Sequence, residues 1–143
     1  MTLRLPRAMI EEMIAHARDD LPNEACGVIL GKDGRAVELR RARNAEASPY
    51  RYSIHPEDLF HFHKEVEERD LEFMVIYHSH VASEAYPSPT DVRLAQWHGT
   101  DPPTDMYPGA YYVLVSLADR EKPVVRAYRI QGGQVSEEQL ETE

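Results

Sequence analysis

The sequence predicts an α/β or α+β fold in which helices flank a β-sheet. Three observations indicate this class: apolar residues at helical spacing near the start of the chain, several short apolar runs bounded by turn residues, and the alternation of these two kinds of segment. The chain has 143 residues, of which 42% are hydrophobic, and no internal repeat. We therefore expect one compact domain over residues 1–143.

The first part of the chain predicts a helix followed by a β-hairpin. Residues 7–18 carry apolar side chains three or four positions apart, opposite a polar face, which is typical of an amphipathic helix. The apolar run 26–31 ends at the turn residues Lys32, Asp33 and Gly34, and this pattern predicts a strand. A second strand over residues 36–43 would complete the hairpin.

The middle of the chain predicts a strand, a helix and a second strand with a polar end. Residues 50–54 fit a short strand, and Pro56 suits the first position of a helix. The apolar face of that helix is marked by Leu59, Phe60, His63 and Val66. The hydrophobic run 73–77 continues into His78, Ser79 and His80, and polar residues at the end of a buried strand indicate a functional site.

The last part predicts a third helix over residues 89–97 and two strands over residues 110–117 and 124–130. The stretch 97–109 is longer than a direct connection requires. It fits a lid, an oligomer contact such as that of a homodimer, or a plain surface insertion. The polar tail 131–143 is expected to fray.

Composition and charge exclude several classes of function. The 25 acidic and 16 basic residues give a net charge of −9, which argues against a nucleic-acid partner because it repels the phosphate backbone. No stretch approaches the roughly 18 to 20 apolar residues of a membrane span, so no membrane partner is expected. Cys26 is the single cysteine, which excludes an internal disulfide, and the start of the chain lacks a secretory signal. We expect a cytoplasmic protein.

Two histidines at a strand end form the strongest candidate site. Side chains two apart in a strand point to the same face, so His78 and His80 present two imidazoles side by side. Zinc accepts imidazole nitrogens, and hydrolytic zinc sites use three protein ligands and leave one position for water. Asp91, at the start of the predicted third helix, is the candidate third ligand.

Asp91 also has a second interpretation. Ser88 and Asp91 match a capping box, in which the acid only satisfies backbone N–H groups at the start of a helix. Taken alone, this pattern favours capping, whereas beside two histidines on one strand face it favours a metal ligand. The two roles can coexist for Ser88.

Glu24 is the candidate for the general base that hydrolysis requires. It precedes the apolar strand 26–31, where a charged group facing the core is costly unless it has a role. Its alternative interpretation is an ordinary exposed acid in the helix-to-strand loop, and spacing alone favours that alternative.

Other reactive residues fit a site less well. His61 and His63 are two apart, but on a helix they diverge by roughly 200° and cannot share one ion. Cys26, within an apolar strand, favours an inert core thiol over a nucleophile.

At these positions the chain resembles the JAMM metalloprotease motif of the JAB1/MPN family. The motif is an upstream Glu, then His-x-His, seven residues, Ser, two residues and Asp, and the matching positions here are Glu24, His78, His80, Ser88 and Asp91. The resemblance implies that the two histidines and Asp91 bind Zn2+, that Glu24 is the general base, and that Ser88 helps to stabilise the oxyanion. It also implies a curved mixed β-sheet flanked by helices, similar to the cytidine deaminase fold.

Within the family, the resemblance is strongest to small bacterial peptidases that release cysteine from a ubiquitin-like sulfur carrier protein. It covers most of the chain, through residues 23–27, 44–46, 48–49, 75–80, 84–88, 112–116 and 128–130. It implies a partner with a C-terminal Gly-Gly, joined by an amide to cysteine, and a place in cysteine biosynthesis. Three alternatives stay open: a broader isopeptidase that removes ubiquitin-like modifiers from lysines, a non-catalytic MPN scaffold, and a general carboxypeptidase for small peptides.

Overall fold

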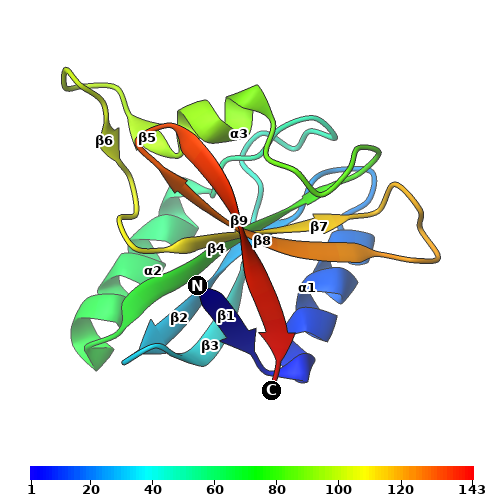
Figure 1. Cartoon of the computed structure of the whole chain (residues 1–143), viewed down its shortest axis with the longest axis horizontal. Coiled ribbons are helices and arrows are strands. Elements are labelled where there is room, and N and C mark those ends of the chain that lie inside the picture. The colour runs from blue at the N-terminus through cyan, green and yellow to red at the C-terminus, as the bar shows by residue number, and fades with distance from the viewer.

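A mixed β-sheet forms the centre of the molecule. The computed structural model describes residues 1–143. The strands are β1 (Thr2–Leu5), β2 (Cys26–Lys32), β3 (Arg35–Ala42), β4 (Glu72–His80), β5 (Gln96–Trp97), β6 (Thr104–Asp105), β7 (Tyr111–Ser116), β8 (Val124–Gln131) and β9 (Gln134–Thr142), and the helices are α1 (Arg7–Asp19), α2 (Pro56–Arg69) and α3 (Pro89–Leu94). Seven strands form one sheet in the order β1-β9-β8-β7-β4-β2-β3, with the helices outside it (Figure 1). The predicted class, a sheet flanked by helices, is confirmed.

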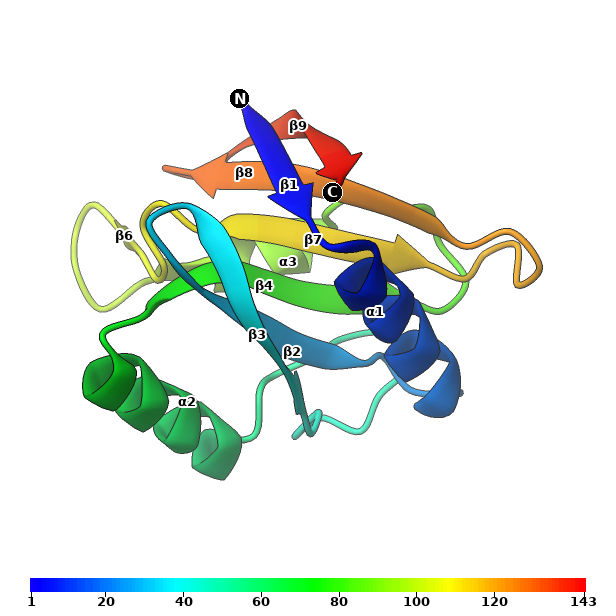
Figure 2. The same ribbon diagram turned by 90° about the horizontal axis from the view of Figure 1, so that it is seen from below.

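Strand β4 lies inside the sheet between β2 and β7. It pairs antiparallel with β2, where Cys26 lies opposite His78, and parallel with β7, where His80 lies opposite Ser116. The sheet curls so far that the edge strand β1 returns to the neighbourhood of the other edge strand, β3 (Figure 2). The curved mixed sheet expected from the family resemblance is therefore present.

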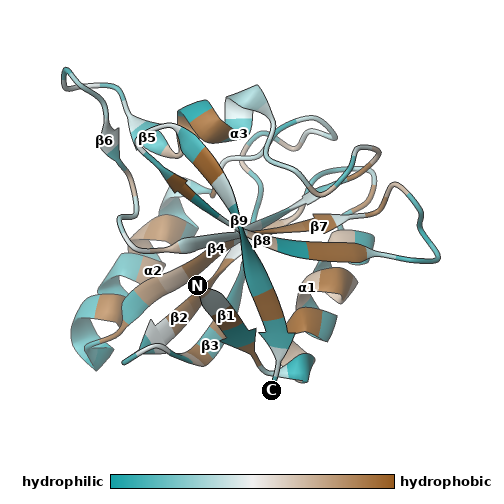
Figure 3. Cartoon of the chain, viewed as in Figure 1, coloured by the Kyte–Doolittle hydropathy of each residue, from teal (hydrophilic) through white to brown (hydrophobic).

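Each face of the sheet buries its own hydrophobic cluster. Helix α1 contributes Met13 to the cluster on one face, together with Val75 of β4. Helix α2 contributes Phe62 to the cluster on the other face, together with Ile76 of β4. Figure 3 shows apolar residues concentrated in the central strands and on one side of α1. Removing these side chains from water is the main source of stability, and it makes β4 a rigid support for the residues at its end.

Two segments form less regular structure than their sequence predicts. Residues 50–54 make only an isolated bridge, between Asn44 and Ile54, because side-chain hydrogen bonds from Asn44 organise the loop instead of a strand ladder. The third helix ends at Leu94 rather than Trp97, because β5 pairs with β6 in a separate two-stranded sheet. The stretch 97–109 thus contains the end of β5, the connection to β6 and β6 itself, which together form most of a small hairpin.

The two ends of the chain form more structure than expected. The polar tail does not fray as a whole: residues Gln134–Thr142 are β9, which pairs with β8 and with β1. Strand β1 itself is too short to stand out in the sequence, yet Leu3 and Leu5 are buried. None of the three helices has the length and apolar character needed to cross a bilayer.

Candidate metal centre

The two histidines lie at the carboxyl end of β4 and are almost completely buried. His78 exposes 2% and His80 4% of its surface. Their alternation along the strand turns both rings to the same face of the sheet, with ring centroids 5.1 Å apart. Strand β4 is paired with β2 on one side and with β7 on the other, which fixes its backbone. The backbone of β4 therefore sets the separation of the two imidazoles.

Asp91 brings its carboxylate to both imidazoles. Its Oδ2 atom lies 3.1 Å from Nε2 of His78 and 3.0 Å from Nε2 of His80. One possible ligand atom from each of the three residues lies within 4.8 Å of the others, and all three residues are buried. The three side chains predicted as ligands from the sequence are therefore together.

The capping interpretation of Asp91 is confirmed. The backbone N–H of Asp91 donates to Oγ of Ser88 at 3.0 Å, and the backbone N–H of Ser88 donates to Oδ2 of Asp91 at 2.9 Å. Pro89 fills the first helical position, where a backbone N–H is not required. The cap fixes the carboxylate at the start of α3, so capping and facing the histidines are two results of one geometry.

The hydrogen bonds of His80 indicate that a cation fits this site. Nδ1 of His80 lies 2.8 Å from the carbonyl oxygen of Glu84, and because a carbonyl only accepts, Nδ1 must carry the proton. The Nε2 atom of the neutral ring then presents a lone pair to the Asp91 carboxylate, so two acceptors face each other unless a proton or a metal ion lies between them. A carbonyl behind a ligating imidazole is also the usual orienting partner at metal sites.

Burial and hydrogen bonding shift the pKa values of these groups in opposite directions. Burial lowers the pKa of His78, more than its contact with Asp91 raises it. For His80, burial also lowers the pKa, but the bonds to Asp91 and to the Glu84 carbonyl outweigh it and the net pKa is raised. Burial raises the pKa of Asp91, yet the hydrogen bonds with both histidines hold it well below its usual value. Asp91 is thus an anion, as a metal ligand must be.

Tyr52 closes one side of the site. Its ring stacks on the His78 ring, with centroids 4.2 Å apart and planes 20° from parallel. Nδ1 of His78 is buried without a hydrogen-bond partner. The Tyr52 ring and the contact of Nε2 with Asp91 therefore orient this imidazole together, and nothing in the spacing of the sequence singles out Tyr52.

Glu24 is buried beside this group, not exposed in its loop. It exposes 4% of its surface, and its Oε1 atom has no hydrogen-bond partner. The pKa of Glu24 is raised to about 8, chiefly by burial; the charge of His80 opposes this rise and the charge of Asp91 adds to it. A buried carboxyl oxygen without a partner is costly, and a carboxyl with a raised pKa in such a setting is a candidate proton acceptor.

The other reactive residues lie outside the site, as expected. His61 and His63 are exposed on α2. Cys26 is completely buried, and burial raises the pKa of its thiol to about 12, so it remains a thiol at neutral pH.

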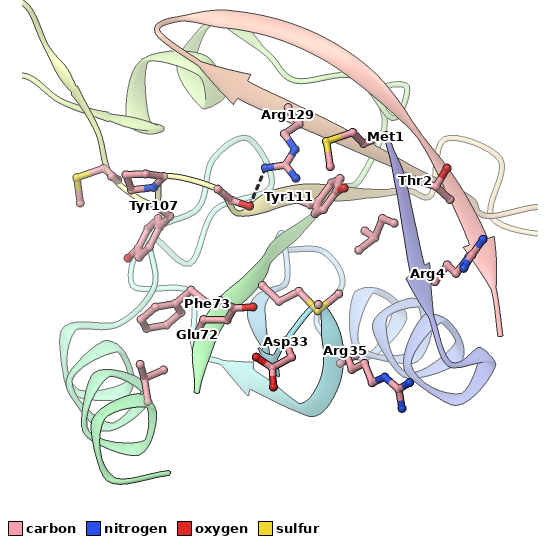
Figure 4. Close-up of a pocket in the computed structure, with 18 of the residues that line it drawn as sticks. Met1, Thr2, Arg4, Asp33, Arg35, Glu72, Phe73, Tyr107, Tyr111 and Arg129 are labelled. Carbon is pink, nitrogen blue, oxygen red and sulfur yellow. Dashed lines mark hydrogen bonds between the residues drawn. The ribbon is translucent and has the colours of Figure 1, made fainter. Parts of the chain in front are cut away.

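A large cavity lies at the other end of the sheet. It has a volume of about 1350 Å³ and is lined by the start of β1, the turn between β2 and β3, and the first residues of β4 and β7 (Figure 4). Its charged lining mixes both signs: Arg4, Arg35, Arg129, Asp33, Glu72 and Glu143. None of the predicted site residues contributes to it, so this cavity is separate from the predicted metal site.

The curved mixed sheet and the strand-end histidines facing a helix-start aspartate define the class: a protein of the JAB/MPN fold with a JAMM-like metal site. The chain belongs to the family described as prokaryotic homologs of the JAB domain, which matches residues 6–131.

Similar proteins of stated function or known structure cover much of the chain. The CysO-cysteine peptidase of Mycobacterium tuberculosis is 42% identical over 132 residues, 91% of this chain and 84% of that protein. A desampylase of Pyrococcus furiosus is 35% identical over 75 residues, 52% of this chain and 54% of that protein. The solution structure of a Desulfitobacterium hafniense protein is 31% identical, with a TM-score of 0.81 over 100% of this chain and 93% of that chain. These likenesses indicate a JAMM-type peptidase.

Proposed function

We propose that this protein is a zinc-dependent peptidase that hydrolyses the amide between the C-terminal glycine of a ubiquitin-like sulfur carrier protein and cysteine. The convergence of His78, His80 and Asp91 on one buried point carries the proposal. The 42% identity to a CysO-cysteine peptidase supports this choice of substrate. The released products would be the carrier with a free C-terminus and cysteine.

His78, His80 and Asp91 would hold the zinc ion. Two neutral imidazoles and one carboxylate are a set of ligands that catalytic zinc sites use, and three protein ligands leave one position open. Zinc, when bound, supplies Lewis-acid polarisation of the scissile carbonyl and lowers the pKa of water. The Glu84 carbonyl keeps the proton of His80 on Nδ1, so that Nε2 is free to act as the ligand atom.

Glu24 would act as the general base and then as the general acid. Its carboxylate takes a proton from the attacking water and gives it to the amine of cysteine as the amide bond breaks. Burial, which favours the protonated form of Glu24, makes the carboxylate a stronger proton acceptor than an exposed glutamate. One buried carboxylate can therefore serve both proton transfers.

Ser88 would stabilise the oxyanion. Its Oγ accepts the backbone N–H of Asp91, which leaves the hydroxyl hydrogen of Ser88 free to donate. Donors of this kind, fixed before the reaction, contribute a few kcal/mol in comparable hydrolases. The helix cap holds the Ser88 hydroxyl in a fixed position next to a proposed metal ligand.

The decisive experiment weighs the carrier after incubation with the zinc-loaded protein. A carrier–cysteine adduct should lose the mass of one cysteinyl unit, and the Glu24→Gln variant, as a matched control, should leave the adduct intact. No mass change with zinc-loaded wild type would contradict the proposal.

A broader isopeptidase that removes ubiquitin-like modifiers from lysines is the second candidate. The 35% identity to a desampylase favours it, although that match covers only 52% of the chain. A carrier–lysine conjugate, run beside the cysteine adduct, separates the two functions. Cleavage of the lysine conjugate at an equal or higher rate would replace the first proposal by the second.

A further inference from the structure

Hydrogen bonds of the backbone, rather than of the side chain, fix the location of Glu24. Its Oε1 atom has no partner, and the residue lies in the connection between α1 and β2, outside any helix or strand. A catalytic group must stay within about 0.5 Å of its productive position. Some other contact must therefore hold this segment, and the following inference rests on the proposed role of Glu24 as the base.

Ser79 holds the segment from the side of β4. In the β2–β4 ladder Cys26 lies opposite His78, so the next pair would be Ala25 and Ser79. The backbone N–H of Ser79 donates to the carbonyl oxygen of Ala25 at 3.0 Å, as a regular ladder requires. The reciprocal bond is different: the backbone N–H of Ala25 donates to the side-chain Oγ of Ser79, at 2.8 Å. The side chain of Ser79 thus takes the part of a backbone carbonyl at the point where β2 leaves the sheet.

Asn44 holds the segment from the opposite side. Its Nδ2 group donates to the carbonyl oxygens of Glu24, at 3.1 Å, and of Arg51, at 3.0 Å. Its Oδ1 atom accepts the backbone N–H groups of Glu46 and Ser53, both at 3.0 Å. The side-chain amide of Asn44 therefore links the backbone carbonyl of Glu24 to the backbone of the loop over residues 46–53.

The contacts of Ser79 and Asn44 satisfy three of the four backbone polar groups of Glu24 and Ala25. The fourth group, the N–H of Glu24, donates to the carbonyl oxygen of Ser48 at 2.8 Å, within the loop that Asn44 organises. Ser79 also stands between the two histidines in the sequence and is 1% exposed. The strand that carries the imidazoles therefore also holds the backbone next to Glu24.

We propose that Ser79 and Asn44 are positioning residues for the Glu24 carboxylate. Neither is needed as a metal ligand, so removing their bonds should leave metal binding intact and displace only the base. A displacement of about 1 Å can cost roughly 100-fold in rate even when the substituted group takes no part in the chemistry. Because the substitutions would displace the proposed base and remove no ligand of the metal, the loss should fall on kcat and not on KM.

The test compares Ser79→Ala with Ser79→Thr and with a matched control on the same strand. Tyr77→Phe also removes one buried hydroxyl hydrogen bond, that between Tyr77 and His16 at 2.8 Å, but on the face of the sheet that α1 covers. We expect Ser79→Ala to keep its zinc and its KM for the carrier–cysteine adduct while kcat falls about 10- to 100-fold. Ser79→Thr, which retains a hydroxyl, should restore most of kcat, and Tyr77→Phe should stay within about twofold of wild type.

A second readout does not depend on activity. In metal-free protein, amide hydrogen exchange of Ala25 should accelerate at least about tenfold in Ser79→Ala relative to Tyr77→Phe, because the acceptor of that N–H is gone. Asn44→Asp is the second variant: it keeps the two accepted bonds of Asn44 and removes the two donated ones, and it should lower kcat with zinc retained.

Three results would overturn the inference. One is a kcat within about twofold of wild type in both Ser79→Ala and Asn44→Asp, another is loss of zinc from both, and the third is unchanged exchange of the Ala25 amide in Ser79→Ala. Failure of the proposed function is distinct, because wild-type protein would then release no cysteine. The exchange of Ala25 would in that case still decide whether Ser79 holds this segment.

Discussion

Replacing Glu24 by glutamine should change the pH dependence of stability in the metal-free protein. Burial raises the pKa of this carboxyl from its usual value of 4.5 to about 8. The native state therefore keeps its proton at a pH where the unfolded chain has released it. Below pH 4.5 the carboxyl is neutral in both states and costs nothing. As the pH rises above 4.5, ionisation stabilises only the unfolded chain, so the folded protein loses stability until the pH reaches about 8.

The size of the effect follows from the distance between the two pKa values. Each pH unit between them is worth about 1.4 kcal/mol, so wild type should lose about 3 kcal/mol between pH 4.5 and about pH 7 through this one group. Glutamine does not ionise and escapes this loss. Its amide can itself cost about 1–3 kcal/mol if a donor stays unpaired, but that cost does not depend on pH.

Urea unfolding of metal-free wild type and Glu24→Gln, followed by circular dichroism from about pH 4 to pH 8, measures the effect. Subtracting one curve from the other cancels every group that the two proteins share. The difference should move by about 4 kcal/mol in favour of the variant across this range, of which about 3 kcal/mol falls between pH 4.5 and about pH 7. Parallel curves would show that Glu24 titrates as an exposed acid, and the argument for a buried base would fail. Zinc should diminish the difference, because a nearby cation stabilises the carboxylate of wild type.

Three further predictions concern the site when it is assembled. Zinc-loaded Glu24→Gln should keep its metal, by elemental analysis, and lose about 10²- to 10⁴-fold in cysteine release because an amide cannot accept the proton; near wild-type turnover would remove Glu24 as the base. His78→Ala or Asp91→Ala should be purified with little or no zinc, and an undiminished zinc content would contradict the ligand set. Ser88→Ala removes the helix cap, which should lower the free energy of unfolding by about 0.5–2 kcal/mol. It also removes the proposed oxyanion donor, which should lower kcat by about 10²- to 10³-fold. Ser88→Thr should keep most of both, and an unchanged kcat in Ser88→Ala would limit Ser88 to capping.

The arrangement of the proposed ligands could be predicted from sequence because its parts are local. The spacing of His78 and His80 fixes two side chains on one strand face, and the sequence around Ser88 fixes a helix start within reach of them. Both depend on backbone periodicity and capping, which act over a few residues. The same locality explains why the capping and ligand interpretations of Asp91 could not be separated by sequence: they use the same backbone conformation.

The contacts that surround the ligands could not be predicted, because they depend on pairing between distant segments. Strand β1 forms only by pairing with β9 at the other end of the chain. Asn44 stops residues 50–54 from forming a strand by binding their backbone with its side chain, which no propensity of that segment indicates. Tyr52 reaches His78 only because that loop folds back over the sheet.

The proposed metal site and the proposed base therefore depend on different parts of the fold. The proposed ligands belong to one continuous piece of chain, from the end of β4 to the start of α3, whose geometry follows from a strand and a helix cap. Glu24 arrives from the connection between α1 and β2, and only the register between β2 and β4, with Cys26 opposite His78, brings it to the same end of the sheet. Substitutions that disturb that register should yield protein that binds zinc and does not turn over. Protein that turns over without zinc should not arise from any substitution, and finding one would contradict the division of roles between the ligands and the base.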